Sequence, residues 1–255
     1  MTGDVDSRLP LLLPLLLRPP LLLMAIALTT ATASAAAEPL PALVQGAAVP
    51  SPGWRVQGWP AQEMPLTDYS AEQVDGRQAL RMQARASYGN LVHERPAQAP
   101  PRSITWAWRM QQPNAKADLR TRAGDDAAAK VCMSFDLPLQ QVPVVERAML
   151  RLARSRSGQA LPGATLCWVW AGGEAPGSVV VNAYTRRVRY VVLRTAADPT
   201  GQWLTEARDV AADFQRAFGD ESATTPALTA VIVAADADNT GVTTVAHITD
   251  LRFVP

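Results

Sequence analysis

Acidic residues gather in two short segments of this sequence, and carboxylates can bind cations or transfer protons. In the first segment, Asp236 and Asp238 follow an apolar run and precede Gly241. Acidic residues at positions 1 and 3 with glycine at position 6 are typical of the start of a calcium-binding loop. Position 12 is His247, so the closing glutamate of an EF-hand is missing. Calcium bound by Asp236 and Asp238 is therefore one alternative for this segment.

The favoured interpretation of the same segment is a turn between two strands. Asp and Asn side chains accept hydrogen bonds from backbone N–H groups at a strand end, and glycine permits a positive φ. We therefore expect Asp236 and Asp238 to act mainly in stability, with Asp238→Ala costing about 1 kcal/mol. Direct contact with a substrate is the third alternative.

Asp125 and Asp126 form the second acidic segment. Neighbouring side chains in an extended chain diverge, so these two serve one bond as an acid/base pair only if a loop turns them together. The sequence lacks G-x-S-x-G, H-E-x-x-H, P-loop and dinucleotide-binding motifs. His93 is interpreted as an exposed loop histidine rather than a base. We therefore predict no catalytic residue.

The elements that must position these residues are mostly strands. Eight strand-like segments are separated by turns rich in Gly, Pro, Asn or Asp, which is typical of an all-β protein. They cover residues 78–86, 103–110, 129–137, 165–171, 179–183, 188–195, 228–235 and 243–254.

Tryptophans alternate along two of these strands, at Trp106 and Trp108 and at Trp168 and Trp170. Residues two apart share one face of a strand. Paired indoles can form a platform for sugar rings, but here they share their faces with Ile, Leu and Met. This composition favours burial between two sheets.

A polar face is predicted on the strand over residues 129–137. Lys130, Cys132, Ser134 and Asp136 alternate there with apolar residues. Cys167, the other cysteine, lies opposite the tryptophans of its own strand. Two cysteines in an exported protein usually form one disulfide, and cross-strand neighbours on one face can do so. We therefore predict a Cys132–Cys167 bond if the strands are adjacent, and no zinc site.

One predicted helix follows Asp209, which is placed as its N-cap. Val210, Phe214 and Phe218 recur at helical spacing, and Gly219 ends the helix. These residues predict a short helix with one buried face.

A second helix is predicted over residues 143–156, with an apolar row on one face and a basic row on another. The rows are Val145, Met149 and Leu152, and Arg147, Arg151 and Arg154. A basic row of this kind can lie on an anionic membrane surface. A solvated helix face is the favoured interpretation.

The first 37 residues have the pattern of a secretory signal, with arginines around an apolar block and an A-x-A end. Prolines divide the apolar block, and neither piece reaches the roughly 20 residues needed to span a bilayer. We expect a cleaved signal over 1–37, a Pro/Ala-rich leader over 38–52 and one domain over 53–255. The protein would then be periplasmic or secreted, without a membrane span.

Charge is nearly balanced, with 24 Lys and Arg residues against 23 Asp and Glu. Nucleic-acid binding is disfavoured, because no basic excess is available to neutralise phosphates. The many short strands predict an all-β fold, an antiparallel, jelly-roll-like β-sandwich with two short peripheral helices.

Several segments of the mature chain resemble a bacterial family known as domain of unknown function 3047. They are residues 104–109, 124–131, 161–163, 167–171, 182–185, 203–219 and 236–241. The resemblance implies an exported single domain without an assigned activity. Aromatic or aliphatic residues are usual in the family where this chain has cysteines, which argues against catalytic thiols. At fold level, residues 76–82 and 248–253 are similar to the ends of jelly-roll carbohydrate-binding modules.

The sequence leaves two alternative functions open. The favoured one is non-catalytic binding of a glycan or another cell-envelope ligand, because no nucleophile–base pair or metal triad can be assembled. The alternative is a polysaccharide hydrolase or lyase that uses loop carboxylates. Neither requires a cofactor, apart from the calcium alternative. The candidate ligand-binding residues are Arg109, Asp125, Asp126, Lys130, Ser134, Asp136, Tyr184, Asp236 and Asp238.

Overall fold

The computed structural model describes residues 38–158 and 160–254. The predicted signal over residues 1–37 lies outside the described residues. The strands are β1 Arg55–Gln57, β2 Asp68–Val74, β3 Arg77–Arg85, β4 Asn90–Gln98, β5 Ser103–Gln112, β6 Ala129–Phe135, β7 Ala164–Trp170, β8 Val179–Val181, β9 Val188–Arg194, β10 Trp203–Asp209, β11 Leu228–Ala234 and β12 Thr243–Val254. The helices are α1 Val144–Ser157, α2 Val210–Phe218 and the short 3-10 helix η1 Arg122–Gly124.

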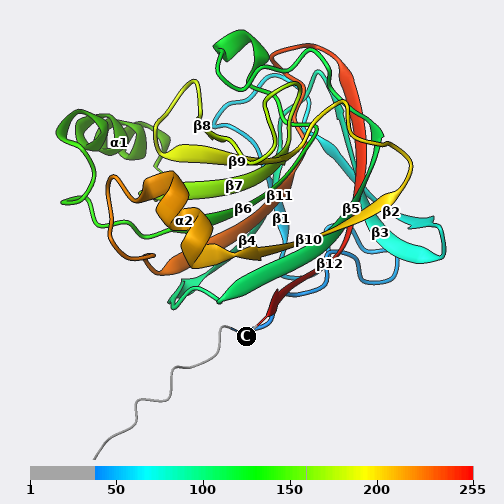
Figure 1. Ribbon diagram of the computed structural model, residues 1–255, viewed down its shortest axis with the longest axis horizontal. Helices are drawn as coiled ribbons and strands as arrows, with labels where there is room; N and C mark the ends of the chain where they lie inside the picture. Colours follow the sequence, from blue (N-terminus) through cyan, green and yellow to red (C-terminus); the bar gives the residue numbers. More distant parts are fainter. Residues whose placement is uncertain (1–37, 159, 255) are drawn as a thin grey trace, which may run out of the picture. The chain divides into compact units, whose positions relative to one another are not determined.

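The strands form two sheets that face each other (Figure 1). The seven-stranded sheet has the order β1-β4-β11-β6-β7-β9-β8, and the five-stranded sheet has the order β10-β5-β12-β3-β2. From β3 to β6 the chain changes sheet at every step, as in jelly-roll sandwiches. Strand β7 pairs with β9 in parallel, because β8 takes the edge position and runs back beside β9. The predicted all-β sandwich is confirmed.

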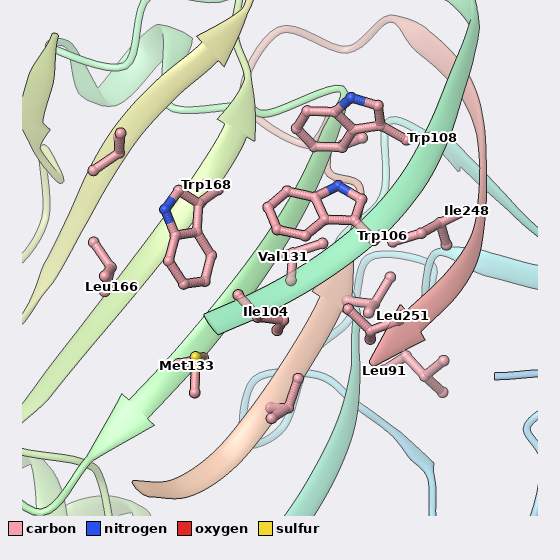
Figure 2. Close-up of a cluster of buried hydrophobic side chains, with 14 of the residues drawn as sticks. Leu91, Ile104, Trp106, Trp108, Val131, Met133, Leu166, Trp168, Ile248 and Leu251 are labelled. Atoms are coloured by element: carbon pink, nitrogen blue, oxygen red, sulfur yellow. The ribbon is translucent and has the colours of Figure 1, made fainter. Parts of the chain in front are cut away.

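Tryptophans fill the space between the sheets (Figure 2). Trp106 contacts Trp168, and Trp108 contacts Trp170, with ring centroids 5.7 and 5.5 Å apart. Each of the four side chains is almost completely buried, so the predicted burial is confirmed. The indole N–H of Trp168 donates to Asp213 of α2 at 2.7 Å, which satisfies a polar group that burial would otherwise leave unpaired.

Helix α2 begins and ends as predicted. Asp209 accepts a hydrogen bond from the Ala212 backbone N–H at 2.8 Å, and Gly219 follows the last turn. Phe214 and Phe218 are buried in the core. The amphipathic spacing therefore attaches this helix to the sandwich through its apolar face.

Strand β4 corrects the prediction of an exposed loop around His93. The run Asn90–Gln98 lies inside the seven-stranded sheet, between β1 and β11. Proline disfavours a strand interior because it cannot donate to the ladder. Here Pro96 lies at an irregularity, where residues 95–97 oppose Thr229 of β11. The bulge accommodates the proline.

The seven-stranded sheet is buried on both faces at its centre, since β6 and β7 have no exposed residue. The face turned away from the five-stranded sheet, called the outer face below, has its own buried cluster that includes Leu119, Cys132, Cys167, Val169 and Tyr190. This second apolar cluster supports the floor of the candidate site.

Candidate ligand-binding groove

A groove with a volume of about 1140 Å³ crosses the outer face of the seven-stranded sheet. Its floor contains side chains from successive strands, among them Asn90 of β4, Ile232 of β11, Lys130 of β6, Thr165 of β7 and Tyr190 of β9. Alternation along each strand turns these side chains to the same face, while their neighbours enter the tryptophan core. The polar face predicted for β6 is therefore the floor of the groove.

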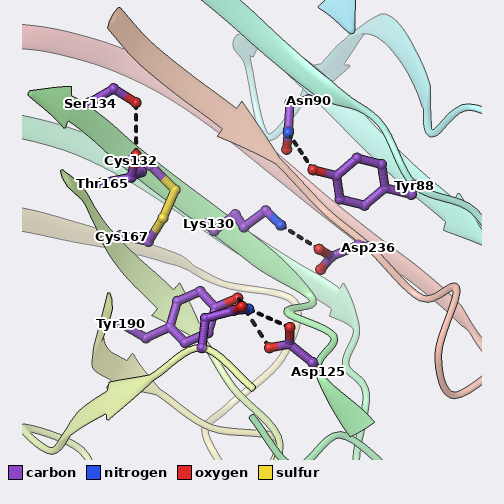
Figure 3. Close-up of a disulfide and its surroundings, with 11 residues drawn as sticks. Tyr88, Asn90, Asp125, Lys130, Cys132, Ser134, Thr165, Cys167, Tyr190 and Asp236 are labelled. Atoms are coloured by element: carbon purple, nitrogen blue, oxygen red, sulfur yellow. Dashed lines mark hydrogen bonds and ion pairs between the residues drawn. A yellow bond between two sulfur atoms is a disulfide. The ribbon is translucent and has the colours of Figure 1, made fainter. Parts of the chain in front are cut away.

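A disulfide joins Cys132 and Cys167 at the centre of this floor (Figure 3). The two residues are direct partners in the β6–β7 register, which is the adjacency that the sequence prediction required. Two residues further along each strand, Ser134 lies opposite Thr165. Their hydroxyl oxygens are 3.1 Å apart and share a hydrogen bond. The floor thus offers hydroxyl groups beside a covalent cross-link.

Lys130 and Asp236 form a buried ion pair on the floor. The other carboxylate oxygen of Asp236 accepts from the Ala127 backbone N–H at 2.6 Å. Burial alone would lower the pKa of Lys130, but the carboxylate of Asp236 and other nearby groups raise it above its ordinary value. Lys130 also lies 5.5 Å from the centroid of the Tyr88 ring. Lys130 is therefore a fixed cation within the groove.

Asp125 lies beside this pair and is bonded by two neutral side chains. Its carboxylate accepts from the Tyr190 hydroxyl at 3.1 Å (Figure 3). It also accepts from the Asn182 side-chain amide. Burial, together with the negative charge of Asp236, raises the pKa of Asp125 to about 6. Asp125 therefore changes its protonation state near neutral pH.

Asp238 is a further carboxylate of the groove lining. Burial, and the charges of Asp236 and Asp126, raise the pKa of Asp238 to about 6. One of its carboxylate oxygens is buried without a hydrogen-bond partner among the described residues. The other accepts from the Asn239 amide at 3.4 Å. Asp238 is thus poorly stabilised by its own protein.

Asp126 lies outside the groove lining and stabilises the loop that carries Asp236 and Asp238. Its carboxylate accepts from the backbone N–H groups of Asn239 at 3.1 Å and Thr240 at 2.7 Å, and from the Thr240 hydroxyl at 2.5 Å. The turn has Gly241 at a φ of +69°, as the sequence suggested. The predicted turn is present, but the backbone N–H groups of Asn239 and Thr240 donate to Asp126 of a second loop rather than to Asp236 or Asp238.

The described residues offer no cluster of side chains that would support the calcium alternative. Within residues 38–158 and 160–254, no group of three or more His, Cys, Asp or Glu side chains could hold a metal ion. Lys130 and the Ala127 N–H already engage the two oxygens of Asp236.

Two exposed aromatic residues lie along the groove. Trp59 is 56% exposed and stacks on Tyr88, with ring centroids 4.7 Å apart and an interplanar angle of 15°. Tyr184 is 54% exposed, and its hydroxyl lies 2.8 Å from Oδ1 of Asn239. The sequence prediction missed Trp59, although an exposed tryptophan between glycine and proline in a loop is a signal of a binding surface.

The structure brings most of the predicted site residues together. Those that line the groove are Asp125, Lys130, Ser134, Asp136, Tyr184, Asp236 and Asp238. Arg109 is not brought to it, since this residue lies on β5 of the other sheet and pairs with Asp75 at 3.2 Å. The groove residues that the prediction missed are Trp59, Tyr88, Asn90, Asn182 and Tyr190.

A family model described as "Protein of unknown function (DUF3047)" matches residues 52–252. The match includes both sheets and every groove residue named above. No curated protein matches the chain. Among the described residues, no helix is long and apolar enough to cross a membrane.

Proposed function

This chain belongs to the DUF3047 family, and we propose that it is a non-catalytic module that binds a glycan of the cell envelope in the groove. The observation that carries the proposal is the combination of an exposed indole, Trp59, with a wide groove whose floor is rich in polar groups. Export to the periplasm or the cell exterior belongs to the same proposal and is supported by the signal-like pattern of residues 1–37.

The volume of the groove favours an extended ligand. Pockets for small molecules usually have volumes of roughly 300–1,000 Å³. At about 1140 Å³, the groove exceeds this range and crosses several strands of one sheet. A chain of several sugar rings has suitable dimensions for such a site.

The chemistry of the lining favours sugars over purely apolar ligands. An indole presents an apolar, polarisable face, and the stack of Trp59 on Tyr88 fixes that face at the groove. Hydroxyl and amide groups of Ser134, Thr165 and Asn182 can exchange hydrogen bonds with sugar hydroxyls. Lys130 and Asp125 add a fixed donor and an acceptor.

A second candidate function is cleavage of the same glycan by a hydrolase or lyase mechanism. It is favoured by Asp125 and Asp238, two groove carboxylates whose pKa values are raised to about 6. A carboxylic acid with such a pKa can serve as a general acid near neutral pH. Binding remains the first proposal because no nucleophile or base is assigned beside them.

A glycan array probed with the purified protein tests the binding proposal. We expect selective binding to polysaccharide fragments, and the bound glycans should remain intact after prolonged incubation. Shortened products that disappear in Asp125→Asn or Asp238→Asn would replace the binding proposal with the enzymatic one. An array without any bound glycan would contradict both.

A further inference from the structure

The outward face of α1 is apolar, which reverses the usual arrangement of a peripheral helix. Val144, Val145, Met149 and Leu152 are 52–76% exposed. Their spacing places them on one side of the helix, together with exposed Ala148. In Figure 1, α1 lies to one side of the seven-stranded sheet, apart from the strands.

The inward face of α1 is attached mainly by polar contacts. Leu150 is its one fully buried residue. Arg147 donates to the Val142 carbonyl oxygen at 2.9 Å, and Arg154 donates to the Leu161 carbonyl oxygen at 2.8 Å. Two members of the predicted basic row therefore hold the helix to neighbouring loops. The expectation of a solvated basic face was wrong for these two arginines.

Positive charge borders the apolar face. Arg151 and Arg156 are exposed, and within residues 38–158 and 160–254 neither has a hydrogen-bond or ion-pair partner. The helix contains four arginines and one acidic residue, Glu146. The whole chain has a formal net charge of only +1, so this excess is local.

We propose that α1 binds the surface of an anionic lipid bilayer, with its apolar face among the acyl chains and Arg151 and Arg156 at the headgroups. An apolar helix face flanked by basic residues is the arrangement that interfacial helices use. Burial of Met149 and Leu152 removes apolar surface from water, and the two arginines are attracted to negative headgroups. A second copy of this helix would meet these arginines with its own, so charge favours anionic lipid as the occupant.

Membrane binding through α1 would also fix the position of the groove relative to the lipid surface. Arg154, Leu161 and Pro162 line one part of the groove, and Arg154 belongs to α1 itself. A chain docked through α1 would therefore hold this part of the groove near the lipid headgroups. The membrane proposal does not depend on the groove ligand being a glycan.

Co-sedimentation with lipid vesicles tests the proposal. Vesicles contain equal parts of phosphatidylglycerol and phosphatidylcholine, or phosphatidylcholine alone. Every variant is expressed from the full chain and processed in the same way as the wild type. The wild type should bind the anionic vesicles and not the neutral ones. Met149→Glu should weaken this binding about ten-fold or more, since it places a negative charge in the apolar face. Arg151→Gln should weaken it about five-fold and reduce its salt dependence.

Met64→Glu is the matched control, because Met64 is also exposed but lies in the loop between β1 and β2. It should bind like the wild type. Circular dichroism should show that every variant is folded. Wild-type binding that is absent, or equal on neutral vesicles, would overturn the proposal. So would a dimer in analytical ultracentrifugation that Met149→Glu dissociates while vesicle binding is unchanged.

Discussion

At the residue scale, the buried pair of Lys130 and Asp236 joins the groove floor to the loop beside it. Lys130 comes from β6, whereas Asp236 follows β11 and also accepts from the Ala127 N–H. A charge buried without its partner is far more costly than a pair. The two residues therefore depend on each other, and the shape of the floor depends on both.

Lys130→Met should lower the free energy of unfolding by about 3–5 kcal/mol, because it leaves the Asp236 carboxylate buried and unpaired. Adding Asp236→Asn should restore a large part of this loss, since the amide oxygen can still accept from Ala127. Arg55→Met removes an exposed pair with Glu94 and should cost less than about 1 kcal/mol. Urea denaturation measures all three, and equal losses in Lys130→Met and Arg55→Met would refute a buried pair.

Asp238 gives a pH-dependent prediction. Its folded pKa of about 6 lies above its ordinary value of 3.8, so the ionised group costs stability. The cost is fully present above about pH 6 and disappears as the pH falls below about 4. Asp238→Asn should therefore raise the free energy of unfolding by about 1 kcal/mol at pH 7.5, a value reduced for solvent screening. This gain should shrink towards zero at pH 4.

Asp136→Asn is the control for Asp238→Asn, because Asp136 is an exposed carboxylate of the same groove. It should change stability by less than about 0.5 kcal/mol at either pH. Denaturant unfolding at both pH values makes the comparison. A loss of stability in Asp238→Asn at pH 7.5 would restore the sequence interpretation, in which Asp238 supports the turn.

At the scale of elements, the disulfide links β6 and β7 directly across the floor. Replacing Cys132 and Cys167 together by alanine should lower the free energy of unfolding by about 2–4 kcal/mol, given their sequence separation of 35. Thermal unfolding with and without a reductant provides a second measurement. The double variant should be insensitive to the reductant, and a wild type that is equally insensitive would contradict a disulfide that supports the fold.

The sequence was most informative where one face of an element is strongly apolar. Strand β5, with Trp106 and Trp108, and helix α2, with Phe214 and Phe218, were predicted because alternation or helical spacing identifies their buried faces. Strands β1, β2, β4 and β10 were missed. They are polar or short, and β4 contains Pro96, so their extended form depends on pairing with neighbours.

The candidate site was predictable to the extent that it follows strand alternation. The polar face of β6 gave Lys130, Ser134 and the Cys132–Cys167 pair. Alternation does not tell which sheet a strand joins, so Arg109 was grouped with the groove although β5 belongs to the other sheet. The role of Asp126 depends on a contact with residues more than 110 positions away, which local sequence does not contain.

For the whole molecule, the groove and helix α1 lie on connected surfaces, since Arg154 belongs to both. The two proposals together describe a protein that holds a glycan at a lipid surface. Each has its own test, because vesicle binding requires no glycan and glycan binding requires no vesicle. The groove is the central claim, and Trp59 is the residue through which it can be tested with least effect on the core.

Isothermal titration calorimetry with the best-binding glycan from the array tests the groove most directly. We predict that Trp59→Ala weakens binding about ten-fold, since a ring stacked on an aromatic side chain contributes on the order of 1 kcal/mol. Arg109→Ala, which changes the opposite sheet, should bind like the wild type. Both variants should keep the wild-type thermal midpoint to within a few degrees. Equal affinity of Trp59→Ala and wild type, or a loss in Arg109→Ala alone, would contradict a ligand site in the groove.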